Sequence, residues 1–164
     1  MNTFLSMNKT TMRMNTMSAS SKKRQAGQAA VEFALIMVFL IVFLLSFIEI
    51  TALVYTYSVL ADSAKEGVRY GVVHGTLSVT CNGPGAAGIA CDGGAAGVKG
   101  AVTTYARGSL NNTTGMTVTP TYPDGSSTPS SRVRVVVSYA YQPLFGLGWP
   151  TVNVNAASEG RIAF

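Results

Sequence analysis

Two acidic residues, Glu32 and Glu49, border the most apolar stretch of the chain, Phe33 to Ile48. On a helix their carboxylates would lie about 26 Å apart, and the hydrocarbon core of a bilayer is about 30 Å thick. A carboxylate at a membrane edge is costly unless it is paired, so such an acid is a functional candidate. We expect this of Glu32, for which the alternative is a simple acid at a helix start. For Glu49 the spacing predicts only an interfacial acid.

The basic residues are unevenly placed along the 164-residue chain. From Gln28 onward seven basic residues balance seven acidic ones, whereas five basic residues and no acid precede Gly27. This asymmetry beside an apolar run predicts that residues 1–27 stay cytoplasmic and residues 50–164 are exported. A neutral exported part without a basic face argues against binding to nucleic acid. A conventional cleaved signal peptide is the weaker alternative, because the apolar run is longer than a usual signal core. The five early basic residues are Lys9, Arg13, Lys22, Lys23 and Arg24.

Both cysteines of the chain, Cys81 and Cys91, fall in the glycine-rich segment from Gly75 to Gly100. In an exported region two cysteines favour a disulfide. Closing so short a loop would stabilise the fold by a little under about 3 kcal/mol. Two unpaired thiols are the alternative that stays open.

Residues that could form a catalytic or cofactor site are few. His74 is the only histidine and no CxxC pair is present, so no metal centre is predicted. Gly83 to Gly88 formally matches GxGxxG, but Pro84 removes one of the amides that a dinucleotide site needs. The exported part has neither paired acids nor a nucleophile motif, and we predict no enzyme and no cofactor.

The first half of the chain predicts one long helix. Residues 1–26 lack an apolar period and are expected to be disordered, with Gly27 as a helix breaker. Beyond the apolar run a stripe of small residues continues at helical spacing, which predicts a helix of about 45 residues that ends near His74 and Gly75. Asp62 with Lys65, and Glu66 with Arg69, are spaced as i,i+3 pairs on its other faces. The stripe consists of Ala61, Ala64, Val68 and Gly71.

The second half predicts one more helix and then strands. Apolar residues between Ala95 and Ala106 recur with helical period. The period then changes to two, with Met116 and Val118 opposite a row of threonines. Arg132 to Tyr141 is the clearest strand, and Thr151 to Ser158 is the last, with Val152, Val154 and Ala156 directed inward. Pro123 to Ser131 is expected to be a turn-rich linker. The order predicts an α+β fold in which residues 61–72 cover a small antiparallel sheet.

An apolar loop, Leu144 to Trp149, separates the last two predicted strands. It would expose Leu144, Phe145, Leu147 and Trp149 to a partner, or the same residues would cap the edge of the sheet. The sequence leaves both interpretations open.

Two segments carry a resemblance to a known family. GQAAVEFALIMVFLIV, from Gly27, resembles the processing site and membrane span of TadE-like minor pseudopilins of the tight-adherence (Flp, type IVb-related) pilus system. AKEGVRY, from Ala64, is similar to the AxExxRY-like pattern that follows the span in this family, and VRVVVSYAYQPL is similar to a strand near its C-terminus. Many relatives carry a proline where Val38 stands here, so no kink is expected at that position.

The resemblance implies roles for four residues. A prepilin peptidase would cut after Gly27 on the cytoplasmic side, and Gln28 would become the new N-terminus. Glu32 would then be the fifth residue, followed by the aromatic Phe33. Its carboxylate would neutralise the freed α-amino group of a neighbouring subunit and set the register between packed helices.

The resemblance also implies an organisation and a set of partners. Residues 1–27 would be a removed leader, residues 28–60 a transmembrane helix, and residues 61–164 an exported pilin-like α+β domain. Expected partners are the prepilin peptidase, other pilins and pseudopilins, the inner-membrane assembly platform and membrane lipid, with an oligomeric assembled state. The alternative is an unprocessed, membrane-tethered exported domain that binds or adheres.

Overall fold

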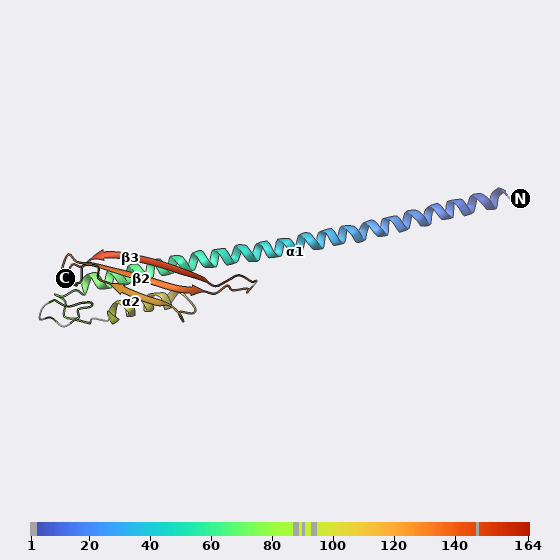
Figure 1. The fold of residues 1–164 in the computed structure, drawn as a ribbon. Coiled ribbons are helices and arrows are strands. Elements are labelled where there is room, and N and C mark those ends of the chain that lie inside the picture. Colours follow the sequence, from blue (N-terminus) through green and yellow to red (C-terminus); the bar gives the residue numbers. More distant parts are fainter. Residues whose placement is uncertain (1–2, 87–88, 90, 93–94, 147) are drawn as a thin grey trace. The chain divides into compact units, whose positions relative to one another are not determined.

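The computed structural model describes residues 3–86, 89, 91–92, 95–146 and 148–164, with side chains from Gly27 onward. Helix α1 (Thr3–Val73) is followed by helix α2 (Ala96–Ser109) and by strands β1 (Thr117–Thr121), β2 (Arg132–Tyr141) and β3 (Val152–Arg161) (Figure 1). The strands form one antiparallel sheet in the order β1-β2-β3. The predicted α+β fold is confirmed. Contacts divide the chain into two compact units, residues 1–47 and 48–164.

The first unit is the N-terminal part of α1. Helix α1 begins at Thr3, so the predicted disorder is wrong for residues 3–26, and so is the predicted break at Gly27. No proline occurs before Pro84, and a single glycine costs a helix only about 1 kcal/mol. The apolar side chains of this unit are exposed, with Phe33 at 64% and Phe39 at 73%.

This bare apolar surface distinguishes α1 from the core helix of a water-soluble protein. Among the described residues one helical segment, Gly27–Val73, is long and apolar enough to cross a membrane, and only 6% of its most apolar part is buried inside the protein. A helix that is apolar all round must be covered by protein or by lipid. The described residues bury only a small part of it, which fits a single-pass membrane protein.

The second unit has a core built where α1 and α2 meet the sheet. The stripe of small residues on α1 faces this core, since Ala64 is fully buried and Val68 is 7% exposed. A Cβ added at Gly67 would collide with Val102 of α2, and one at Gly71 would lie 3.2 Å from Val133 of β2. Because Gly67 and Gly71 have no side chains, α1 can pack closely against α2 and β2, as the stripe of small residues predicted. Fully buried core residues are Leu60, Ala64, Val98, Val102, Ala106, Val133, Val135 and Val137.

The sheet is close to its prediction. Strand β2 has the predicted bounds, Arg132–Tyr141, and its alternate valines are buried. Strand β3 begins one residue later and ends three residues later than predicted, because its pairing with β2 continues to Arg161 opposite Arg132. Val154 and Ala156 are buried, whereas Val152, on the same face of the strand, is 39% exposed. Val152 pairs with Tyr141 at the last position of the ladder, where the core ends.

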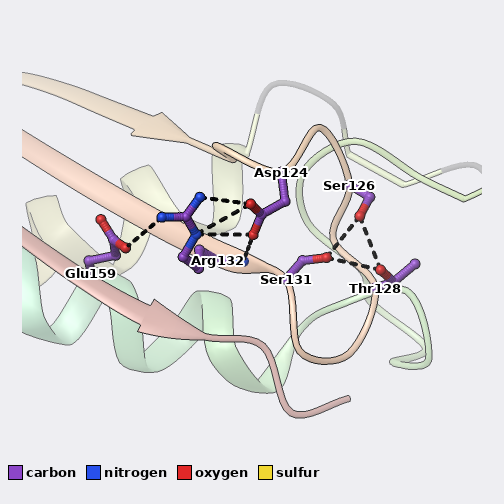
Figure 2. Close-up of polar contacts among 6 residues, drawn as sticks. All are labelled: Asp124, Ser126, Thr128, Ser131, Arg132 and Glu159. Carbon is purple, nitrogen blue, oxygen red and sulfur yellow. Dashed lines mark hydrogen bonds and ion pairs between the residues drawn. The ribbon is translucent and has the colours of Figure 1, made fainter.

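The linker between β1 and β2 is held by side-chain hydrogen bonds (Figure 2). Arg132 Nη2 donates to Asp124 Oδ1 at 2.8 Å, and the Arg132 amide donates to Asp124 Oδ2 at 2.8 Å. This guanidinium lowers the pKa of the Asp124 carboxyl below its ordinary value. Arg132 also lies 3.7 Å from Glu159 of β3. The hydroxyl of Ser126 lies within 3.0 Å of those of Thr128 and Ser131, which closes the turn.

The predicted disulfide between Cys81 and Cys91 crosslinks the glycine-rich segment. The residue after each cysteine reaches the start of α2: Asp92 Oδ2 accepts from the Ala96 amide at 2.6 Å, and Asn82 Oδ1 accepts from the Gly97 amide at 3.1 Å. These contacts satisfy amides that have no partner within the helix. The disulfide therefore also positions the N-terminal caps of α2.

Candidate functional site

The residues for which the sequence predicts processing and register roles lie on one stretch of α1, in the first unit. Gly27 is exposed, and a Cβ added there would meet nothing within 4 Å. One turn apart, Gln28 Nε2 donates to Glu32 Oε1 at 3.2 Å. Phe33 is 64% exposed. Gln28 and Glu32 thus contact each other within one helix, and the predicted pairing of Glu32 with the new N-terminus of a neighbouring subunit stays a prediction.

The other acid, Glu49, is buried and hydrogen-bonded. Its side chain is 5% exposed, in the second unit. Glu49 Oε1 accepts from the Tyr141 hydroxyl at 2.6 Å, and both carboxylate oxygens accept from the Leu144 amide, at 3.0 and 3.1 Å. The place of Glu49 at the far edge of the membrane stays a prediction, but these hydrogen bonds give it a structural role that the spacing did not predict. It is a buried acceptor that joins α1 to the end of β2 and to the loop beyond.

Tyr141 completes this contact from the sheet. Burial, and then its hydrogen bond to Glu49, raise the pKa of its phenol to about 12. Because its neutral form is so strongly favoured, the Tyr141 phenol stays protonated and donates the hydrogen bond to Glu49. Because the Glu49 side chain receives hydrogen bonds from both a hydroxyl and an amide, its buried oxygens are not left without partners.

The loop that Glu49 holds is the apolar loop of the sequence analysis. We call residues 142–151, between β2 and β3, the tip loop; Leu147 lies outside the described residues. Leu144, Phe145 and Trp149 are 65%, 43% and 46% exposed. These side chains therefore do not form a buried cap over the sheet edge, and the surface interpretation fits them better.

Two hollows flank the Glu49 contact. A small one of about 60 Å³ lies between α1 and the tip loop and is lined by apolar side chains beside Glu49. A cleft of about 440 Å³ lies on α1 near Tyr55 and Thr56 and reaches Tyr139 and Leu144. None of the residues that line this cleft is charged, a histidine or a cysteine. The cleft can hold an apolar or hydrogen-bonding group, but its lining offers no acid–base pair or nucleophile–base pair.

The remaining predicted features have modest structural roles. Asp62–Lys65 and Glu66–Arg69 form the predicted ion pairs, at 2.9 and 3.2 Å on exposed parts of α1. His74 stacks on Tyr70 with ring centroids 3.8 Å apart. Within the described part of the chain, no group of three His, Cys, Asp or Glu side chains is placed to hold a metal ion.

The GxGxxG match does not lead into a helix in its described part, and its last two residues, Ala87 and Gly88, lie outside the described residues. Its Pro84 carbonyl instead accepts from the hydroxyl and the amide of Ser127, at 2.6 and 3.1 Å. The segment is thus tied to the linker between β1 and β2.

Fold and site together define a class: a membrane-compatible helix that carries a small disulfide-bonded α+β domain. In a comparison with protein families, the family described as TadE-like protein matches residues 27–69, which lie on this helix. The match begins at Gly27 and ends at Arg69, within the AKEGVRY segment, and it confirms the TadE-like resemblance over this part of α1. It implies a role in the tight-adherence pilus system. Comparisons with curated proteins and with solved structures give no match.

Proposed function

We propose that the chain is a minor pseudopilin that helps to assemble, initiate or regulate a tight-adherence (Flp) type IV pilus. The observation that carries the proposal is the position of the TadE-like match, which begins at Gly27 and includes the whole bare apolar run. Such a subunit is structural, and its assembly is driven by the packing of exposed apolar helices against those of other pilins and pseudopilins at an inner-membrane platform.

Processing by a prepilin peptidase would remove residues 1–27 on the cytoplasmic side. The exposure of Gly27 and the open space around it support this step, because a peptidase can approach the bond. The bond lies within α1, so the helix must unwind locally before cleavage. Glycine makes unwinding easier by about 1 kcal/mol relative to alanine. The basic cluster from Lys22 to Arg24 would hold the leader at the inner face of the membrane.

After the cut, Glu32 would pair with a new α-amino group at Gln28 of a neighbouring subunit. The reference pKa of such an amine is about 7.7–8.0, so it is cationic at neutral pH. In the structure the Glu32 carboxylate is exposed on α1 and accepts a hydrogen bond from a neutral amide, that of Gln28. A charged partner from outside the chain would neutralise this acid in lipid, and would thereby set the axial register between helices.

The organisation that follows has residues 28–60 in the inner membrane, with the apolar run that ends at Ile48 in its hydrocarbon and residues 49–60 at its outer interface, and residues 61–164 exported. The second candidate function, an unprocessed membrane-tethered binding domain, is favoured by the uncharged cleft of about 440 Å³. The two candidates differ in one measurable property, the N-terminus of the mature protein.

The deciding experiment is intact-mass analysis with N-terminal sequencing of protein from cells with and without the prepilin peptidase. The proposal expects a mature chain that begins at Gln28 only when the peptidase is present, and an uncut chain for Gly27→Ala. Gly100→Ala is the matched control, since Gly100 is also an exposed helical glycine with nothing within 4 Å. A mature chain that begins upstream of position 28, or normal fibres from Glu32→Gln, would contradict the proposal.

A further inference from the structure

We propose that the tip loop is a second membrane contact, which places Leu144, Phe145 and Trp149 in the interfacial layer of the bilayer leaflet where α1 emerges. The inference rests on the proposed membrane insertion of α1. It adds a lipid-binding surface to the domain, which neither the TadE-like match nor the apolar helix itself contains.

The first step is the position of the tip loop along the chain. The apolar run ends at Ile48, and the next residue, Glu49, accepts hydrogen bonds from the Leu144 amide at 3.0 and 3.1 Å. The Tyr141 hydroxyl, 2.6 Å from the same carboxylate, fixes the base of the loop as well. The loop therefore lies beside the residue at which the apolar run ends. Where that run leaves the hydrocarbon, the tip loop must reach the interface.

The second step is the chemistry of the exposed side chains. Leu144, Phe145 and Trp149 are all between 43% and 65% exposed. Trp149 and Ile50 of α1, which is 52% exposed, line one hollow beside Glu49, and the Leu144 amide binds the same carboxylate. Tryptophan and other aromatic residues are enriched at membrane interfaces, where the ring is partly in hydrocarbon and partly hydrated. A lipid interface suits these side chains better than bulk water does.

The third step is the distribution of charge. Residues 135–158, which contain the tip loop and the adjoining halves of β2 and β3, include no charged residue, and neither do residues 50–61 of α1. The charged residues of β2 and β3 pair at the opposite end of the ladder, where Arg132 faces Arg161 and Arg134 faces Glu159. The acid at the loop, Glu49, is buried and hydrogen-bonded. This segregation favours lipid at the uncharged end and water at the charged end.

The test uses Trp149, the only tryptophan of the chain, as a depth probe. Full-length protein is reconstituted into vesicles of phosphatidylcholine and phosphatidylglycerol that contain lipids brominated at defined acyl positions. We expect a blue-shifted Trp149 emission, strong quenching by bromines near the headgroup end of the acyl chain, and weak quenching by aqueous acrylamide. Leu144→Asp should reduce the lipid quenching and raise the acrylamide quenching. Val79→Asp is the matched control, because Val79 is fully exposed on a different loop and should leave both unchanged.

Insertion of α1 is measured separately on the same vesicles by flotation and by resistance to alkaline carbonate extraction. If the protein inserts but Trp149 is quenched by acrylamide and not by brominated lipid, the lipid contact is wrong and the proposed pseudopilin function stands. A blue-shifted Trp149 that brominated lipid fails to quench would indicate burial against a second copy, and it too would overturn the proposal. If the protein does not insert at all, both proposals fall.

Discussion

Removing the Glu49 carboxylate is expected to destabilise the second unit strongly. Glu49→Ala leaves the Tyr141 hydroxyl and the Leu144 amide without their acceptor. A buried donor without a partner costs about 1–3 kcal/mol. We therefore expect a loss of about 2–4 kcal/mol, a large share of the roughly 5–15 kcal/mol that stabilises a domain.

A double-mutant cycle separates the hydrogen bond from the packing around it. Tyr141→Phe keeps the ring and removes the donor, so Glu49→Ala should cost less in that background than in the wild type, by about 1–3 kcal/mol. Glu49→Gln keeps one acceptor oxygen and should cost only about 1–2 kcal/mol. The assay is urea unfolding of the full-length protein in detergent micelles, followed by far-UV circular dichroism and by the fluorescence of Trp149, which lines a hollow beside Glu49.

The control for this cycle is Glu159→Ala, which removes an exposed acid 3.7 Å from Arg132. An exposed ion pair contributes about 0–1 kcal/mol, so this substitution should change the free energy of unfolding very little. If Glu49→Ala were no more destabilising than Glu159→Ala, or if its effect were simply additive with Tyr141→Phe, the hydrogen bond would not hold the tip loop and the reasoning would be refuted.

Three further predictions concern the rest of the second unit. Replacing Cys81 and Cys91 by serine should cost about 3 kcal/mol in urea unfolding and should expose the first amides of α2 to hydrogen exchange. Tyr122→Phe should raise stability by about 1 kcal/mol in the same assay, because the Tyr122 hydroxyl is buried and has no hydrogen-bond partner among the described residues. Asp124→Asn should lower the melting temperature at neutral pH, where the ion pair with Arg132 is formed. Since this pairing lowers the pKa of Asp124 below 3.8, its contribution is present above about pH 3.8 and lost as the pH falls further, so the two proteins should converge in acid.

The regular elements could be predicted because their signals are local. Alternating valines along β2 require one buried face, and the observed bounds match the prediction residue for residue. The small residues from Ala61 to Gly71 mark the packed face of α1 in the same way. The start of α1 was mispredicted because the polar composition of residues 1–26 was interpreted as disorder, although no proline interrupts them.

The role of Glu49 could not be predicted, because its partners are distant in sequence. Tyr141 and Leu144 follow it by 92 and 95 residues, and only the way in which β2 packs along α1 brings them together. One signal was available: residues 135–158 lack charge, and Tyr141 is the last inward residue of the predicted strand. A hydroxyl at the end of an apolar strand needs an acceptor, and Glu49 is the acid that the sequence places at the same end of the domain.

Because of the disulfide between Cys81 and Cys91, complete folding of the domain depends on the redox state of the compartment in which it lies. Asn82 and Asp92 reach the first turn of α2 from positions that the disulfide holds together. If the domain is exported as proposed, the disulfide would be absent in the reducing cytosol and would not hold Asn82 and Asp92 in place. The first turn of α2 would then become fully ordered only in an oxidising compartment. In newly made chains the start of α2 would then remain incompletely ordered until translocation, and it would become ordered in the compartment where a pilus is assembled.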